Sequence, residues 1–226
     1  MIVTGIDGCR GGWVAVSLSP DGLTVRTAGT LEGLDIQGVT GIDMPLGLLA
    51  DGWRTADALA RQALGGSPGG SPGVRGASVF AIPPRPVWAA PDYATANRRC
   101  RELTGRGMSA QAWGLRTRLL EADGFRRGCA HSLREVHPEL SFAALAGAPL
   151  TDSKHRPAGR TVRRALLEGA GIVLPRRVPG AAEHDLLDAA AVAWSARRIA
   201  AGTARVLPGP PRTQLSDDGF EITISY

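Results

Sequence analysis

The sequence has few cysteines, and none is placed as a pair. Cys9, Cys100 and Cys129 are far apart, and no two of them form a CxxC motif. An odd, widely spaced set is not typical of a disulfide framework, and it lacks the ligand spacing of a structural zinc site. We therefore expect three reduced thiols.

Long apolar runs are also missing. No run approaches the roughly 20 residues that a membrane-spanning helix needs. The first residues enter an apolar, strand-like segment without the basic stretch and small-residue cleavage site of a signal peptide, so we expect a cytoplasmic protein. With 226 residues, 43% of them hydrophobic and without internal repeats, the chain is expected to form a single domain over residues 1–226.

Lysine is nearly absent, since Lys154 is the only one, and arginine carries the net charge of +5. A positive balance favours a polyanionic partner such as nucleic acid. Arginines on solvated helix faces would also account for it, and the charge alone does not distinguish the two.

The N-terminal third reads as a series of strands. Residues 2–7, 13–18 and 23–27 are β-rich runs joined by tight turns, which predicts an antiparallel meander. A fourth apolar strand over residues 38–43 ends before Pro45, because proline cannot donate to a sheet ladder. Residues 133–137 are typical of a fifth strand.

Helices follow the fourth strand and the fifth. A helical insertion over about residues 53–130 is expected before strand five, and it contains a glycine- and proline-rich loop at residues 65–73. A mixed five-stranded sheet with helices on its faces is the RNase H-like α/β topology. The expected helices cover residues 53–64, 92–103, 109–122, 139–145, 160–168 and 181–201, and a last strand covers residues 219–226.

Two aspartates share one sequence context. Asp7 and Asp43 each follow Thr-Gly-Ile at the end of an apolar strand, so neighbouring strands would set their carboxylates side by side. Aspartate is disfavoured in strands and costly to bury when ionised, so such a pair needs a cation, a hydrogen-bonding nest or water. Each one taken alone is equally compatible with a turn or a helix cap.

A second acidic pair lies on the long C-terminal helix. Asp185 and Asp188 are three residues apart and therefore project from one helix face. Asp185 could simply favour the dipole of the helix N-terminus, but Asp188 lies a turn further in. Four carboxylates from two strand ends and one helix face suit two Mg²⁺ or Mn²⁺ ions about 3.5–4 Å apart, the arrangement of two-metal phosphoryl-transfer sites.

Several motifs together resemble a known family. The motifs are residues 5–16, 42–47, 104–111, 135–142 and 185–190. They are similar to those of the domain of unknown function 429 family, described as predicted RNase H-like nucleases, and the last helix resembles the metal-binding helix of RuvC-type resolvases. The resemblance implies that Asp7, Asp43, Asp185 and Asp188 are catalytic metal ligands, completed by Glu135 or Glu139. Glu135 is preferred, because it lies within the strand-like run and Glu139 reads as a first-turn helix acid.

Three basic residues are candidates for substrate binding. Arg10 lies in the glycine-rich turn after Asp7, where its guanidinium could hold a phosphate or be a solvated hairpin side chain. Lys154 and Arg160 flank Gly159 ahead of a helix and are also candidate phosphate ligands.

Three polar residues are secondary candidates. His137, before Pro138, is either a general base, an orienting group or a structural histidine. Ser109 reads as a helix cap and Gln111 as a helix-surface residue, although both could contact a ligand from the insertion.

The leading hypothesis is a Mg²⁺- or Mn²⁺-dependent nuclease acting on RNA or DNA. One alternative is an ATP- or phosphate-binding protein with the actin- or sugar-kinase-like fold, which uses Asp-Gly turns against phosphates but needs a second lobe. Another is a non-catalytic nucleic-acid-binding domain, which the basic balance supports.

Overall fold

The computed structural model describes residues 1–65, 76–128 and 133–226. Apart from Gly65, the expected loop at residues 65–73 lies outside the described residues, and so does Cys129. Cys9 and Cys100 are buried, and neither forms a disulfide with a described residue.

The sheet has the predicted topology. Its five strands are ordered β3-β2-β1-β4-β5, with β1, β2 and β3 antiparallel and β4 and β5 running parallel to β1. This mixed sheet with its flanking helices confirms the RNase H-like α/β arrangement expected from the sequence. The strands are β1 (Val3–Cys9), β2 (Gly12–Ser19), β3 (Gly22–Ala28), β4 (Val39–Ile42) and β5 (Leu133–Glu135).

The remaining elements differ from the expected pattern in three places. A short helix over Arg85–Trp88 was not predicted. The segment at residues 109–122 forms two helices, because Gly114, a poor helix former, ends the first of them. The strand expected at residues 219–226 is reduced to β7 (Ile224–Ser225), which pairs with the two-residue strand β6 (Val206–Leu207), and Glu221 forms an isolated bridge with Leu215 instead. The α-helices are α1 (Thr55–Ala63), α2 (Arg85–Trp88), α3 (Tyr93–Thr104), α4 (Ala110–Gly114), α5 (Arg116–Gly128), α6 (Pro138–Ala146), α7 (Pro157–Gly169) and α8 (Glu183–Ala200), with 3₁₀ turns at Glu32–Leu34 and Gly76–Ser78.

None of the helices in the described part of the chain is long and apolar enough to cross a membrane.

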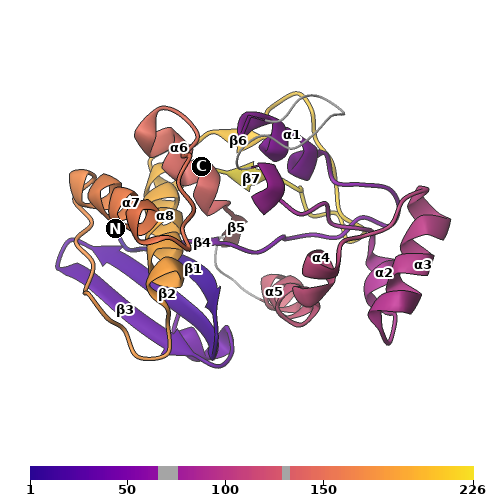
Figure 1. The fold of residues 1–226 in the computed structure, drawn as a ribbon, viewed down its shortest axis with the longest axis horizontal. Helices are drawn as coiled ribbons and strands as arrows, with labels where there is room; N and C mark the ends of the chain where they lie inside the picture. Colours follow the sequence, from indigo (N-terminus) through magenta and orange to yellow (C-terminus); the bar gives the residue numbers. More distant parts are fainter. Residues whose placement is uncertain (66–75, 129–132) are drawn as a thin grey trace. The chain divides into compact units, whose positions relative to one another are not determined.

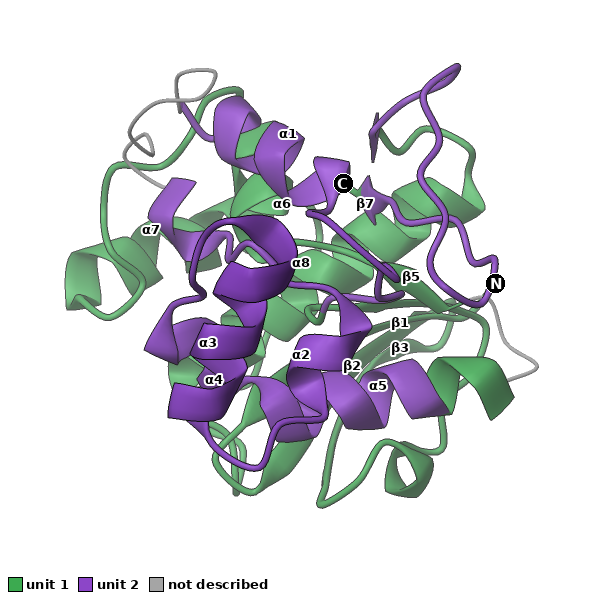
Figure 2. Cartoon of the chain, turned by 90° about the vertical axis from the view of Figure 1, so that its right-hand side faces the viewer, with its two compact units in different colours: residues 1–44, 125–205, 225–226 green, residues 45–124, 206–224 purple. Residues whose placement is uncertain are grey.

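The chain forms two compact units (Figure 2). The first contains residues 1–44, 125–205 and 225–226, and therefore the whole five-stranded sheet. The second contains residues 45–124 and 206–224, which take in α1 to α4, most of α5 and the segment before β7. The prediction of one domain over residues 1–226 stays a prediction.

In the first unit, α8 lies against one face of the sheet, and α6 and α7 pack beside it (Figure 1). Glycines in the strands allow this close packing, because a β-carbon on Gly5 would collide with the α8 backbone and one on Gly41 would collide with Val192. Val14 and Val16 of β2 join the alanine-rich face of α8 in the buried core. This face of the sheet is referred to below as the α8 face.

The second unit has its own buried contacts. Trp88 of α2 stacks on Trp113 of α4, with ring centroids 6.2 Å apart and planes inclined by 8°. Arg85 forms ion pairs with Asp123 and Asp217, which ties α2 to α5 and to the segment before β7. These contacts hold the short helices of the unit together.

Candidate metal centre

Strand register brings Asp7 and Asp43 together. Ile6 pairs with Ile42 across the parallel strands β1 and β4, and the backbone N–H of Asp43 donates to the carbonyl of Ile6 at 2.8 Å. Side chains alternate along a strand, so Asp7 lies on the same face as Gly5, which is the α8 face, and Asp43 lies on the same face as Gly41. The two carboxylates therefore meet at the end of the strands, beneath α8.

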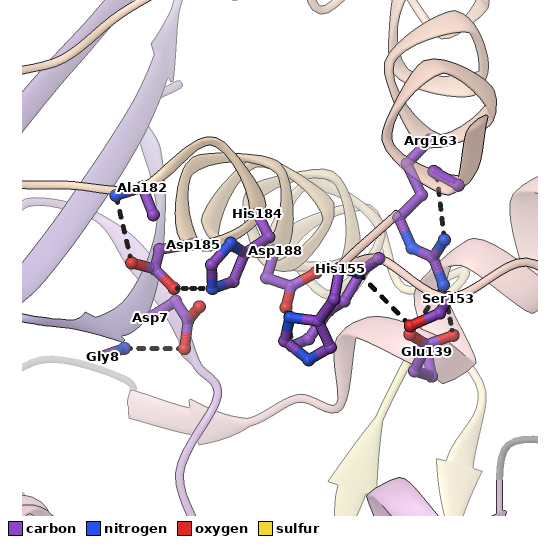
Figure 3. Close-up of polar contacts among 12 residues, drawn as sticks. Asp7, Gly8, Glu139, Ser153, His155, Arg163, Ala182, His184, Asp185 and Asp188 are labelled. Carbon is purple, nitrogen blue, oxygen red and sulfur yellow. Dashed lines mark hydrogen bonds and ion pairs between the residues drawn. The ribbon is translucent and has the colours of Figure 1, made fainter. Parts of the chain in front are cut away.

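The third carboxylate comes from α8. Asp188 is fully buried, and one oxygen each of Asp7, Asp43 and Asp188 lies within 4.8 Å of the other two. Asp7 is anchored by its own turn, because the backbone N–H of Gly8 donates to its Oδ1 at 2.7 Å (Figure 3). These three residues are called the acidic triad below.

Burial is the main cause of the raised pKa values in the acidic triad. Desolvation raises the pKa of Asp7 well above its usual range, and the negative charges of Asp43 and Asp188 raise it further. Desolvation raises the pKa of Asp43 to about 7, against an opposing attraction from Lys154. Desolvation also raises the pKa of Asp188. Charged carboxylates at this position are therefore favoured only when a cation accompanies them.

The two oxygens of Asp188 have different surroundings. Oδ2 forms an ion pair with the Lys154 ammonium, whereas Oδ1 is buried and accepts no hydrogen bond from any described residue. A buried carboxylate oxygen without a partner costs free energy, and a metal ion is one way to satisfy it. The acidic triad can hold a metal ion on these grounds.

Lys154 lies in the loop before α7 and faces the acidic triad. Burial lowers its pKa, but the attraction of Asp188, Asp7 and Asp43 outweighs burial and raises the pKa above its ordinary value. Its side chain is 30% exposed. The ammonium predicted to bind phosphate is therefore engaged by a carboxylate in this structure.

Asp185 is not among the three residues that come together. Its Oδ2 accepts a hydrogen bond from the backbone N–H of Ala182 at 3.2 Å, and its Oδ1 lies 3.2 Å from Nε2 of His184 (Figure 3). Asp185 thus accepts a hydrogen bond at the N-terminus of α8, in keeping with the helix-terminus role that the sequence offered as its alternative to a metal ligand.

The two candidate glutamates lie in different places. Glu135 pairs with Ile42, so strand alternation directs it to the face opposite Asp43 and the acidic triad. Glu139, in the first turn of α6, is close enough to raise the pKa of Asp43 and Asp188, and its carboxylate is held by Arg163 at 2.8 and 2.9 Å. Glu139 therefore acts electrostatically on the acidic triad.

A family model described as "Protein of unknown function (DUF429)" matches residues 5–213. The chain belongs to this family. No curated protein and no solved structure matches this chain.

Two other basic candidates of this DUF429 chain have different surroundings. Arg10 is exposed in the β1–β2 turn, and its side chain contacts no described residue through a hydrogen bond or ion pair. Arg160 pairs with Glu183 at 2.9 Å and donates to the carbonyl oxygen of His155 at 2.9 Å. Arg160 therefore secures the loop before α7.

The secondary candidates occupy helix ends. Ser109 caps α4, since its Oγ accepts from the N–H of Ala112 at 3.1 Å, and Gln111 is exposed on that helix. Both belong to the second unit, whereas the acidic triad lies in the first. His137 is the N-cap residue of α6, where its carbonyl accepts from the N–H of Ser141 at 3.1 Å.

Arg163 and His155 were not singled out from the sequence. Arg163 is fully buried and holds Glu139 through both carboxylate oxygens, but nothing marks it among many arginines. His155 packs edge-on against His184, with ring centroids 5.1 Å apart, and burial lowers its pKa. Only tertiary contacts identify these two residues.

Proposed function

We propose that this chain is a Mg²⁺- or Mn²⁺-dependent hydrolase that cleaves phosphodiester bonds in nucleic acid. The observation that carries the proposal is the acidic triad, whose three ligand oxygens lie within 4.8 Å of one another at the end of an RNase H-like sheet. An all-carboxylate oxygen set is the kind that Mg²⁺ and Mn²⁺ prefer over softer metals.

Asp7, Asp43 and Asp188 are the proposed ligands of the metal. A bound divalent cation there would lower the pKa of water and stabilise negative charge on a phosphate. The protein contributes placement, because β1, the end of β4 and α8 bring the three carboxylates together. Asp43 and Lys154 are both partly exposed, which supports access of a substrate to the centre.

Charge supports nucleic acid as the substrate. The net charge of +5 comes almost wholly from arginine, whose planar guanidinium suits bidentate contact with phosphate. Arg10 stands just beyond Asp7 with its guanidinium unengaged by the described residues, and it is the proposed phosphate contact.

The proposal is tested by cleavage of labelled single- and double-stranded RNA and DNA with Mg²⁺, Mn²⁺ or EDTA. Asp7→Asn should lower metal-dependent cleavage by about a hundred-fold or more, equivalent to about 3 kcal/mol of transition-state stabilisation. Asp21→Asn is the matched control, because Asp21 is an exposed carboxylate in the β2–β3 turn of the same sheet. Undiminished cleavage by Asp7→Asn, or none by the wild type, contradicts the proposal.

The same samples separate the other functions. Steeply salt-dependent binding without cleavage would favour a non-catalytic nucleic-acid-binding domain. ATP affinity by calorimetry without cleavage would favour the ATP-binding alternative.

A further inference from the structure

We infer that Lys154 is a permanent cation of the centre and takes the place of a second metal ion, so that the acidic triad binds one divalent cation. The inference deepens the proposed function, because it concerns the cofactor requirement of the same site. It departs from the two-metal arrangement that four aspartates would suit.

The two oxygens of Asp188 divide between two cations. Oδ2 already forms an ion pair with the Lys154 ammonium, while the buried Oδ1 has no hydrogen-bond partner among the described residues. Oδ1 is therefore available to a single ion shared with Asp7 and Asp43. Ligand oxygens on opposite sides of Mg²⁺ lie about 4.2 Å apart, and adjacent ones lie about 3 Å apart. The oxygens of the acidic triad lie within 4.8 Å of one another, so small movements of these side chains would let all three bind one ion.

The charge of the centre supports one ion. The nearby Glu139 carboxylate is offset by its partner Arg163. The three ionised carboxylates of the acidic triad and the Lys154 ammonium then leave two net negative charges, which one divalent cation neutralises. A second divalent cation would leave two net positive charges at residues that are largely buried, and uncompensated buried charge is strongly unfavourable. The carboxylate of Asp185 acts on Asp7 through space, but it is hydrogen-bonded at the start of α8 and does not join the three residues whose oxygens come together.

The Lys154 loop is held in place by α7. A β-carbon on Gly159 would lie 2.1 Å from the carbonyl oxygen of Ser153, so only glycine allows the loop to approach the helix this closely. Arg163 donates to the carbonyl of Asp152 at 2.9 Å, and Arg160 donates to that of His155 at 2.9 Å. Lys154 therefore stands between two anchored residues.

Arg163 also links this loop to α6. It donates to Asp152 with Nη1 and to both oxygens of Glu139 with Nη2. Arg163, its carboxylate partner and the loop carbonyl are all in the first unit, so the ammonium is placed by a connected set of contacts. A lysine on an unrestrained loop would not serve as a fixed cation, because its side-chain entropy opposes a single position.

The number of bound ions tests the inference directly. Isothermal titration of the metal-free full-length chain with Mn²⁺ above pH 7 should give one ion per chain, with the paramagnetic resonance spectrum of an isolated Mn²⁺. Lys154→Met should bind two ions and give a spin-coupled spectrum. Lys154→Arg is the matched control, because it keeps the charge and should still bind one ion.

Several results would overturn the inference. Two ions in the wild type would do so without any variant, and so would no binding at all. Lys154→Met with unchanged ion number and affinity would also contradict it. Cleavage assays keep the proposed function separate: one ion without cleavage supports this inference and removes the nuclease, whereas two ions with cleavage do the opposite.

Discussion

Gly5 of β1 lies directly against Ala193 of α8. A β-carbon built on Gly5 would be 2.0 Å from the backbone nitrogen of Ala193 and 2.2 Å from the carbonyl oxygen of Ala189. The helix that carries Asp188 can approach the strand that carries Asp7 only because this position has no side chain. Packing of the core and assembly of the acidic triad therefore depend on the same contact.

Gly5→Ala should destabilise the protein and weaken the metal centre together. The added methyl forces α8 away from β1, and overpacking of this kind costs about 1–3 kcal/mol or more. We expect a lower melting temperature and weaker Mn²⁺ binding by calorimetry. Gly11→Ala is the control, because a β-carbon there meets nothing within 4 Å. Equal melting temperatures for the two variants would contradict the account.

The stability of the metal-free protein should fall as the pH rises from about 4 to about 7. Burial raises the pKa of Asp43 from 3.8 to about 7, so the folded state holds more protons than the unfolded state across that window. The Asp43 shift alone corresponds to up to about 4 kcal/mol. Urea unfolding in EDTA at several pH values measures the effect.

Asp43→Asn isolates that effect. Asparagine does not titrate, so the variant should lose less stability than the wild type between pH 4 and 7. Mn²⁺ added at pH 8 should restore the stability of the wild type, because the cation compensates the carboxylates that have lost their protons. A wild type and variant with the same pH slope would be inconsistent with the raised pKa.

Glu139 and Arg163 should be strongly coupled. Arg163→Met leaves the Glu139 carboxylate buried and unpaired, which typically costs about 3–5 kcal/mol. Arg163→Met combined with Glu139→Leu should cost less than the sum of the two single changes in a urea-denaturation cycle. Arg164→Met is the control on the same helix, because its partly exposed pair with Glu183 is worth about 0–1 kcal/mol. Additive single changes would exclude the coupling.

The two acidic residues of α8 should respond differently to the same substitution. Asp188→Asn removes a proposed ligand. Loss of an outer-shell partner typically lowers metal affinity by about 10- to 100-fold, and the Mn²⁺ affinity of this variant should fall by more than that. Asp185→Asn should lose much less affinity, because an asparagine oxygen can still accept from the N–H of Ala182 and only a through-space charge near Asp7 is removed. Calorimetry with Mn²⁺ decides, and equal losses for the two variants would make Asp185 a ligand.

The sequence predicted the sheet and the juxtaposition of Asp7 and Asp43 for a clear reason. The two Thr-Gly-Ile segments that precede Asp7 and Asp43 are identical, and they pair residue for residue in the parallel ladder. The identical segments before the two aspartates therefore predicted that Asp7 and Asp43 lie side by side. The pairs are Thr4 with Thr40, Gly5 with Gly41 and Ile6 with Ile42.

Other parts of the site depended on information that a local pattern does not contain. Spacing placed Asp185 and Asp188 on one helix face, but whether Asp185 caps the helix depends on where α8 begins. The side on which Glu135 lies depends on the register of β5, where a shift of one residue reverses the face. The contact of Lys154 with Asp188 joins residues 34 apart in the chain, and only tertiary packing creates it.

The most direct test of the metal centre is an anomalous difference map from crystals grown or soaked with Mn²⁺. The account predicts a Mn²⁺ peak within bonding distance of carboxylate oxygens of Asp7, Asp43 and Asp188. A map without a peak there, or with Mn²⁺ bound only elsewhere on the chain, would contradict it.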